Sequence, residues 1–125
     1  MALSEELPIY KEMFTLLNLI LDARDRFPKS YKYAFGEKLM MVSLECLELI
    51  QMANSDKTNR YGYLNEFALR FSTLELMLRV CKERNIITVQ QFAPILRSCG
   101  IVGKMATGWR RSSAKPESSS PPWSR

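Results

Sequence analysis

The sequence of 125 residues contains no histidine, no CxxC cysteine pair and no long apolar run. Without histidine, the chain lacks the usual general base and the most common metal ligand of proteins. No apolar stretch approaches the roughly 20 residues that a membrane-spanning helix needs. We therefore expect a protein that is not an enzyme, does not span or bind a membrane, and needs neither cofactor nor metal.

The remaining reactive residues do not form a recognisable catalytic or metal-binding group. Glu45 and Glu48 share a helix face, but the Glu-x-x-His motif of di-iron bundles is missing. Residues 100–104, Gly-Ile-Val-Gly-Lys, lack the spacing of a phosphate-binding loop. The cysteines are odd in number and fall in apolar helical register, which predicts buried free thiols at Cys46, Cys81 and Cys99. Free thiols, together with an acidic N-terminus where a signal peptide would be basic, predict a cytoplasmic location.

Apolar residues recur with helical spacing along most of the chain and nowhere alternate as in a strand. The pattern predicts four helices, at about residues 8–26, 31–53, 63–84 and 89–111. Four amphipathic helices with short connections favour an all-α fold, an antiparallel up-down-up-down four-helix bundle, over residues 1–111. Residues 112–125 are rich in Ser and Pro, and we expect a disordered tail.

Local signals predict where these helices begin and end. Pro8 suits a first helical turn, and Asn85 suits a left-handed terminator. Thr88 and Gln91 have the spacing of a capping box. Pro94 lies inside the fourth helix, so we expect either a kink there or a regular helix that begins only near residue 92.

Positive charge is concentrated in the second half of the chain. The formal net charge is +5; residues 1–56 hold six Lys or Arg and nine Asp or Glu, for −3, and the remaining residues hold twelve and four, for +8. On the fourth helix Arg97, Lys104 and Arg111 repeat every seven residues, opposite the apolar face. Gly100 and Gly108 lie beside these cations, so the basic face is nearly bare. Such a face suits the phosphate backbone of a nucleic acid.

Further cations extend the candidate nucleic-acid site. Lys29 and Lys32 flank Tyr31 and Tyr33, an arrangement that can neutralise and stack on single-stranded nucleic acid. Arg79 follows Glu75 by four residues, so a helical ion pair is an equally good interpretation there, as it is for Arg70 after Glu66. The candidate nucleic-acid-binding residues are Arg97, Lys104, Arg110, Arg111, Arg79, Lys82, Arg84, Lys29 and Lys32.

The third predicted helix has a second apolar stripe that points away from its core residues. The stripe repeats at i, i+4, i+7 and i+11 and consists of Leu69, Thr73, Leu76 and Val80. In a monomeric bundle, apolar residues on this side would not pack into the core and would be exposed to water. We therefore expect an oligomer interface or a protein partner at this stripe.

Two segments of the chain carry a resemblance to a known family. Phe27-Pro-Lys-Ser-Tyr-Lys-Tyr-Ala-Phe-Gly-Glu-Lys-Leu39 and Gly103-Lys-Met-Ala-Thr-Gly-Trp-Arg-Arg111 resemble the signature segments of the accessory variability determinant of diversity-generating retroelements. The resemblance covers about residues 8–111, and the family is related to bundle proteins encoded in intervening sequences of ribosomal RNA genes. The resemblance implies a pentameric, positively charged barrel that binds a reverse transcriptase and RNA or DNA and supports mutagenic template copying. At residues 106 and 107 the chain departs from the family pattern, which tends to have a larger apolar residue followed by glycine.

Two other functions remain open from the sequence. One is that of the related ribosomal intervening-sequence proteins, bundles whose role is undefined; a neighbouring reverse transcriptase gene would separate the two. Alternatively, it is a helical adaptor that binds only protein through the stripe on the third helix, with its cations on a solvated face. Nucleic-acid binding that weakens with salt would separate the adaptor from the retroelement protein.

Overall fold

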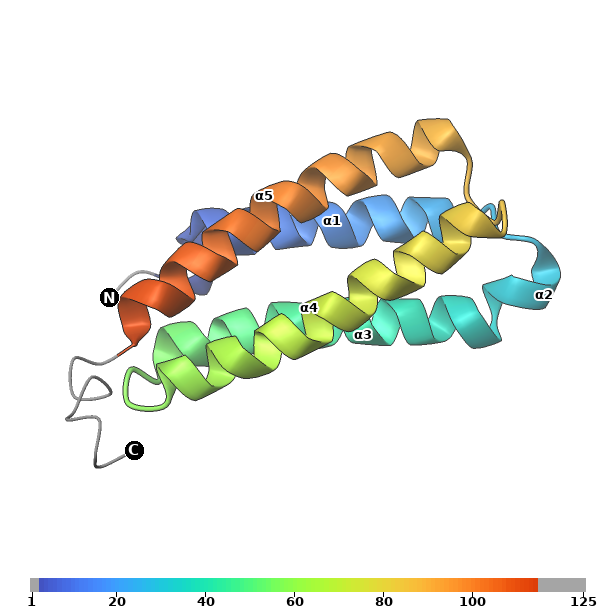
Figure 1. Cartoon of the computed structure of the whole chain (residues 1–125). Helices are drawn as coiled ribbons and strands as arrows, with labels where there is room; N and C mark the ends of the chain where they lie inside the picture. The colour runs from blue at the N-terminus through green and yellow to red at the C-terminus, as the bar shows by residue number, and fades with distance from the viewer. Residues whose placement is uncertain (1–2, 115–125) are drawn as a thin grey trace, which may run out of the picture.

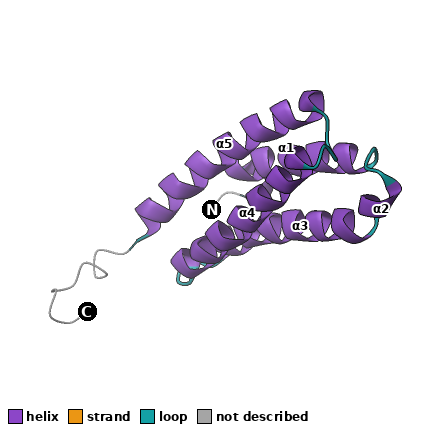
Figure 2. Ribbon diagram, turned by 45° about the vertical axis from the view of Figure 1, so that its right-hand side comes forward, coloured by secondary structure: helices purple, strands orange, loops and turns teal. Residues whose placement is uncertain are grey.

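The computed structural model describes residues 3–114, which form helices and no strands (Figures 1 and 2). A single 3-10 turn, η1 (Ser4–Glu6), precedes four long helices and one short one. They are α1 (Pro8–Arg24), α2 (Lys29–Lys32), α3 (Ala34–Ser55), α4 (Arg60–Glu83) and α5 (Val89–Ser113). The prediction of an all-α bundle is confirmed for these residues. Most of the predicted tail, residues 115–125, lies outside the described residues, whereas Ser112 and Ser113 belong to α5.

The long helices pack around one apolar core, in which each helix has two long neighbours. Helix α1 packs against α3 and α5, and α4 packs against the same two helices. The buried side of α4 follows the helical period of its apolar residues, since Leu64, Phe67, Phe71, Leu74, Leu78 and Cys81 are all buried. The largest side chains that are fully removed from solvent are those of Phe67, Met13 and Leu16. Burial of such apolar surface provides the main stabilisation of a bundle.

Polar contacts join the helices at the two ends of the bundle. At one end, Asn54 of α3 donates to the hydroxyl of Ser4 at 3.3 Å. At the other end, Nε of Arg84, directly after α4, donates to the hydroxyl of Tyr31 in α2 at 3.1 Å. The α3–α4 turn and η1 therefore lie at the same end of the bundle. The α4–α5 connection lies at the opposite end, beside α2 (Figure 1).

The predicted helix signals are confirmed at the α4–α5 connection. Asn85 has a φ of 57°, in the left-handed region, and the N–H of Ile86 returns to the carbonyl of Cys81 at 2.8 Å. The Thr88 hydroxyl accepts from the Gln91 N–H, and the Gln91 side chain accepts from the Thr88 N–H, each at 3.1 Å. This capping box starts α5 at Val89, and the helix continues through Pro94. The alternative of a helix that begins near residue 92 is wrong, because the box already satisfies the first-turn donors.

The predicted second helix differs most from the structure. Instead of one helix from residue 31, a short helix, α2, ends at Lys32 and α3 begins at Ala34. Nε of Arg24 donates to the Lys32 carbonyl at 3.2 Å, between residues eight positions apart. This contact connects α1 to the α2–α3 junction. Helical periodicity alone does not encode it.

Candidate nucleic-acid interface

Helix α5 presents the predicted basic face to solvent. Arg97, Lys104 and Arg111 are exposed, on the side opposite the buried residues Ile95 and Val102. Apart from adjacent residues and the backbone of α5 itself, no atom lies within 4 Å of the position that a Cβ would take at Gly100 or Gly108, so the surface beside the cations is open. The helix contains no Asp or Glu. A polyanionic chain could therefore approach the backbone of α5 without meeting bulky or acidic side chains.

Little of the positive charge is neutralised within the chain. Of the Lys and Arg side chains in residues 3–114, only Arg24 and Arg70 lie within 4.0 Å of a carboxylate oxygen. Arg70 pairs with Glu66 at 3.1 Å, which confirms the helical ion pair predicted there. Arg79 does not pair with Glu75 within this distance, so its charge is available at the surface. The cations of α5, which are Arg97, Lys104, Arg110 and Arg111, likewise have no carboxylate oxygen within 4.0 Å among the described residues.

A second group of cations lies where α2 meets the C-terminal end of α4. Arg79, Lys82 and Arg84 are exposed on α4 and directly after it. The guanidinium of Arg84 lies 5.8 Å from the ring centroid of Tyr31, and Nζ of Lys82 lies 5.9 Å from that of Phe92. Lys29 is exposed in α2, whereas Lys32 is half-buried. The structure thus brings the predicted basic and aromatic residues of α2 together with the cations of α4, while Tyr33 is exposed beside them.

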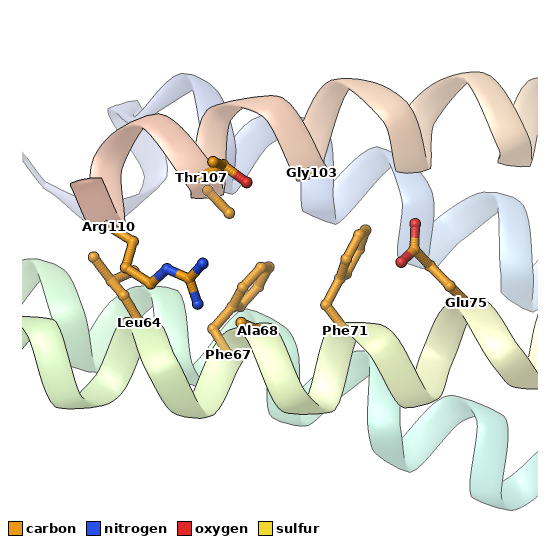
Figure 3. Close-up of a pocket in the computed structure, with 9 residues that line it drawn as sticks. Leu64, Phe67, Ala68, Phe71, Glu75, Gly103, Thr107 and Arg110 are labelled. Carbon is orange, nitrogen blue, oxygen red and sulfur yellow. The ribbon is translucent and has the colours of Figure 1, made fainter. Parts of the chain in front are cut away.

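Arg110 differs from both groups in its burial, although it lines one hollow together with Arg111 of the α5 row. It is half-buried, and Figure 3 shows its side chain extending from α5 into a hollow between α4 and α5, near Leu64 and Phe67. Its neighbour Arg111 is exposed on the outer face. The nine predicted cations therefore form an outer row on α5, a cluster around α2 and the end of α4, and Arg110 in the hollow. They do not form one continuous patch.

Arg60 is a cation whose role the sequence did not indicate. Its Nε donates to the carbonyl of Ala53 at 2.6 Å and its terminal nitrogen to that of Asn54 at 3.1 Å, which satisfies the C-terminal carbonyls of α3. Its guanidinium also lies 5.7 Å from the ring centroid of Trp109. Arg60 therefore joins α3, α4 and α5 as a structural residue. Residues 60 and 109 are far apart in the sequence, so local sequence patterns do not predict their contact.

Buried groups in the described residues do not form a metal site. No cluster of three or more Cys, Asp or Glu side chains in this part of the chain could hold a metal ion. The three cysteines are buried and free, as predicted, and burial raises the pKa of Cys46 and Cys99 to about 12 and that of Cys81 to about 11. Partial burial also raises the pKa of Glu75, although the nearby positive charge of Arg79 acts in the opposite direction. Neutral thiols are poor nucleophiles and poor metal ligands.

The apolar stripe on α4 is exposed. Leu69 and Leu76 expose 64% and 59% of their surface, and Thr73 is exposed beside them. Val80 is half-buried. Two leucines with this exposure on one helix face form an apolar surface that the other residues of the described range, 3–114, leave uncovered. None of the helices among residues 3–114 is long and apolar enough to cross a membrane.

The fold and surface together define a class: a small four-helix bundle with unpaired cations on its outer helix and around one end. A family model described as bAvd-like matches residues 7–113. The chain therefore belongs to the bAvd-like family, and the resemblance based on residues 27–39 and 103–111 is confirmed at the level of the family. No curated protein matches the chain.

Proposed function

We propose that this protein is a non-catalytic accessory protein that binds nucleic acid and associates with a retroelement reverse transcriptase. The observation that carries the proposal is the outer face of α5, where Arg97, Lys104 and Arg111 are exposed, unpaired and separated by open glycine positions. Membership of the bAvd-like family supports the association with a reverse transcriptase and with mutagenic template copying.

The spacing of these cations suits a repeating polyanion. Seven residues of helix advance by about 10.5 Å, so the three side chains form a row of about 21 Å. Neutralising phosphates along such a row releases counterions, which favours binding at low salt and weakens it as salt rises. A face that offers few hydrogen-bonding groups for base edges would bind RNA or DNA with little sequence preference.

The proposed functional form is a homo-oligomer of antiparallel bundles, a pentamer by analogy with the family. The exposed residues Leu69 and Leu76 support an interface on α4, because burying them against another copy would remove apolar surface from water. An assembly with several copies of the α5 face would also bind a long polyanion at several points at once. Such multivalent contact raises the effective affinity without any new type of contact.

Binding to labelled single-stranded RNA and DNA over a range of salt concentrations tests the nucleic-acid function. Replacing Arg97, Lys104 and Arg111 with Ala should weaken binding and reduce the slope of log affinity against log salt by about 2 to 3, since each lost phosphate contact contributes about 0.7 to 0.9. Circular dichroism should show unchanged helix content, because all three side chains are exposed.

A matched control removes the same charge elsewhere. Lys11, Lys38 and Lys57 are exposed in α1, α3 and the α3–α4 turn, and none of them lies on α5. Replacing these three with Ala should leave most of the salt slope intact. If both triple variants lose the same slope, binding depends on net charge alone and the α5 face is not the site.

A further inference from the structure

A hollow of about 310 Å³ lies between the beginning of α1 and the last turns of α5, which run side by side at one end of the bundle (Figure 1). The residues that line it are all apolar, and none of them is charged. They are Leu7, Pro8, Ile9, Met105 and Trp109. Its volume is at the lower end of the roughly 300–1,000 Å³ that is typical of pockets for small ligands. The hollow is therefore large enough to receive one planar ring system.

The indole ring of Trp109, which lines this hollow, is held in place by Arg60. The Arg60 guanidinium lies over the ring, 5.7 Å from its centroid. Arg60 is itself fixed, because it donates hydrogen bonds to the carbonyls of Ala53 and Asn54. A ring that is already ordered loses little conformational freedom when a ligand stacks on it. The hollow therefore offers a preorganised aromatic surface.

The row of cations on α5 borders the hollow. Met105 and Trp109 directly follow Lys104 and Gly108 in the sequence, so each lies about 100° further round the helix. Gly108 lies between Lys104 and Arg111 on the outer face, and its position is open. Neither cation has a carboxylate oxygen within 4.0 Å among the described residues. No side chain at position 108 therefore separates the two cations from the hollow.

This arrangement fits a ligand that combines regular negative charge with flat, largely apolar rings. A single-stranded nucleic acid has both, since its phosphates bind cations and its unpaired bases stack on aromatic side chains. A duplex offers the phosphates but holds its bases within the stack, and extracting one of them costs energy. An acidic protein segment has negative charge without regularly spaced planar rings. A single strand is therefore the ligand that the row and the hollow fit together.

We propose that the α1–α5 hollow receives a base of a single-stranded RNA or DNA whose phosphates bind Lys104 and Arg111, and that Trp109 stacks on this base. The proposal rests on the nucleic-acid function proposed above and adds a subsite that distinguishes single strands from duplexes. Phosphate contacts alone favour the duplex, because its charge density is higher. The base subsite opposes that preference.

A strand without bases separates the contribution of the hollow from that of the row. Oligothymidylate and an abasic phosphodiester strand of the same length carry the same charge, so the row should bind both. The thymidine strand should bind at least about five-fold more tightly, which is the lower end of the range for one base stacked on an aromatic side chain. This difference should persist at high salt, because stacking releases no counterions.

Tryptophan fluorescence reports on the subsite directly. The chain has two tryptophans, Trp109 and Trp123, and Trp123 lies outside the described residues. In the Trp123→Phe variant the emission comes from Trp109 alone, and a base that stacks on the indole should quench it. The abasic strand should bind to the same variant without this quenching.

A pair of glycine variants in the Trp123→Phe background locates the base. Gly108 lies about 40° from Lys104 round α5 on the side of the hollow, and Gly100 lies about 40° from it on the opposite side, towards α4. Both positions are open, so a leucine fits at either. Gly108→Leu should block the hollow from the row, remove the quenching and make the affinities for the two strands equal. Gly100→Leu should leave the quenching and the preference unchanged, and circular dichroism should show the parent helix content in both variants.

Each possible failure has a different meaning. Equal affinity for the two strands, with the salt dependence intact, would overturn the base subsite and leave the phosphate row standing. Equal effects of Gly108→Leu and Gly100→Leu, or quenching by the abasic strand, would also overturn it, because Trp109 would then not be the stacking surface. No binding of either strand at low salt would instead overturn the nucleic-acid function itself, and the subsite with it.

Discussion

The side chain of Arg24 occupies the space that a Cβ at Gly36 would need, because such an atom would lie 3.0 Å from both Cγ and Nε of Arg24. From this position Arg24 donates to the Lys32 carbonyl at 3.2 Å and to the Glu37 carboxylate at 2.6 Å. One arginine of α1 thereby fixes the α2–α3 junction. The segment 27–39, which carries part of the family resemblance, has a structural reason for its glycine.

A pair of alanine substitutions tests this relationship. Gly62→Ala, in α4 where no atom lies within 4 Å of a new Cβ, should raise the free energy of unfolding by about 0.5–1 kcal/mol through helix propensity. Gly36→Ala has the same propensity benefit but crowds Arg24, so we expect a smaller gain or a net loss. Chemical denaturation measures both values.

A double variant separates the two effects at Gly36. In an Arg24→Ala background the crowding is gone, and Gly36→Ala should then stabilise about as much as Gly62→Ala does. A Gly36→Ala effect that is the same with and without Arg24 would show that the two side chains are not coupled.

Local sequence signals predict much of this fold because they act within a few residues. The capping box of Thr88 and Gln91 and the left-handed Asn85 needed no tertiary information, and periodicity identified the buried side of α4. The break at Tyr33 depends on Arg24, eight or more residues away, so the pattern of α3 alone predicts a longer helix. The orientation of Arg110 is a similar case, since its side chain extends from α5 into a hollow that Leu64 and Phe67 of α4 also line.

The buried thiols should react only when the protein unfolds. Burial raises the pKa of all three cysteines above the ordinary value of 9.0, so at pH 8 they are almost entirely neutral in the folded state. We expect a thiol reagent at pH 8 to modify Cys46, Cys81 and Cys99 at a common rate that follows global unfolding. Fast modification of one cysteine in the absence of denaturant would contradict its burial.

The same pKa shifts predict a loss of stability at alkaline pH. A thiol whose pKa is raised on folding contributes its full stability below pH 9, and that contribution is lost as pH rises from about 9 towards 11 or 12. Replacing Cys46 with Ala should make the decline in the free energy of unfolding between pH 9 and 11 less steep. Denaturation of both proteins at several pH values measures the difference, and identical slopes would refute the contribution of this thiol.

The exposed stripe on α4 predicts a homo-oligomer that a single charged substitution in the stripe should disrupt. Leu76→Glu should dissociate the oligomer, because the interface would have to bury an unpaired carboxylate. Leu96 on α5 is exposed to the same extent, 59%, and Leu96→Glu should leave the oligomer intact. Sedimentation velocity at micromolar concentration measures the mass of each, and a monomeric parent protein would exclude the interface.

The association with a reverse transcriptase should depend on the cations at the end of α4. Arg79 and Lys82 lie one turn apart, are exposed, and border a hollow between α4 and α5 beside Phe92. Reversing both charges with Glu should weaken capture of the cognate reverse transcriptase, and more so in low salt than in high salt, where screening over about 10 Å or less already reduces exposed charge interactions. The protein alone should show no polymerase activity, whereas its presence should change cDNA synthesis by that enzyme.

Lys11 and Lys57 provide the matched control for this charge reversal, because both are exposed and lie outside α4 and α5. Changing them to Glu alters the net charge equally and should leave capture nearly intact if the end of α4 is the contact. Equal loss with both double variants would indicate attraction by net charge alone. Failure of the intact parent oligomer to capture any reverse transcriptase would count against the retroelement function and favour a helical adaptor with a different protein partner.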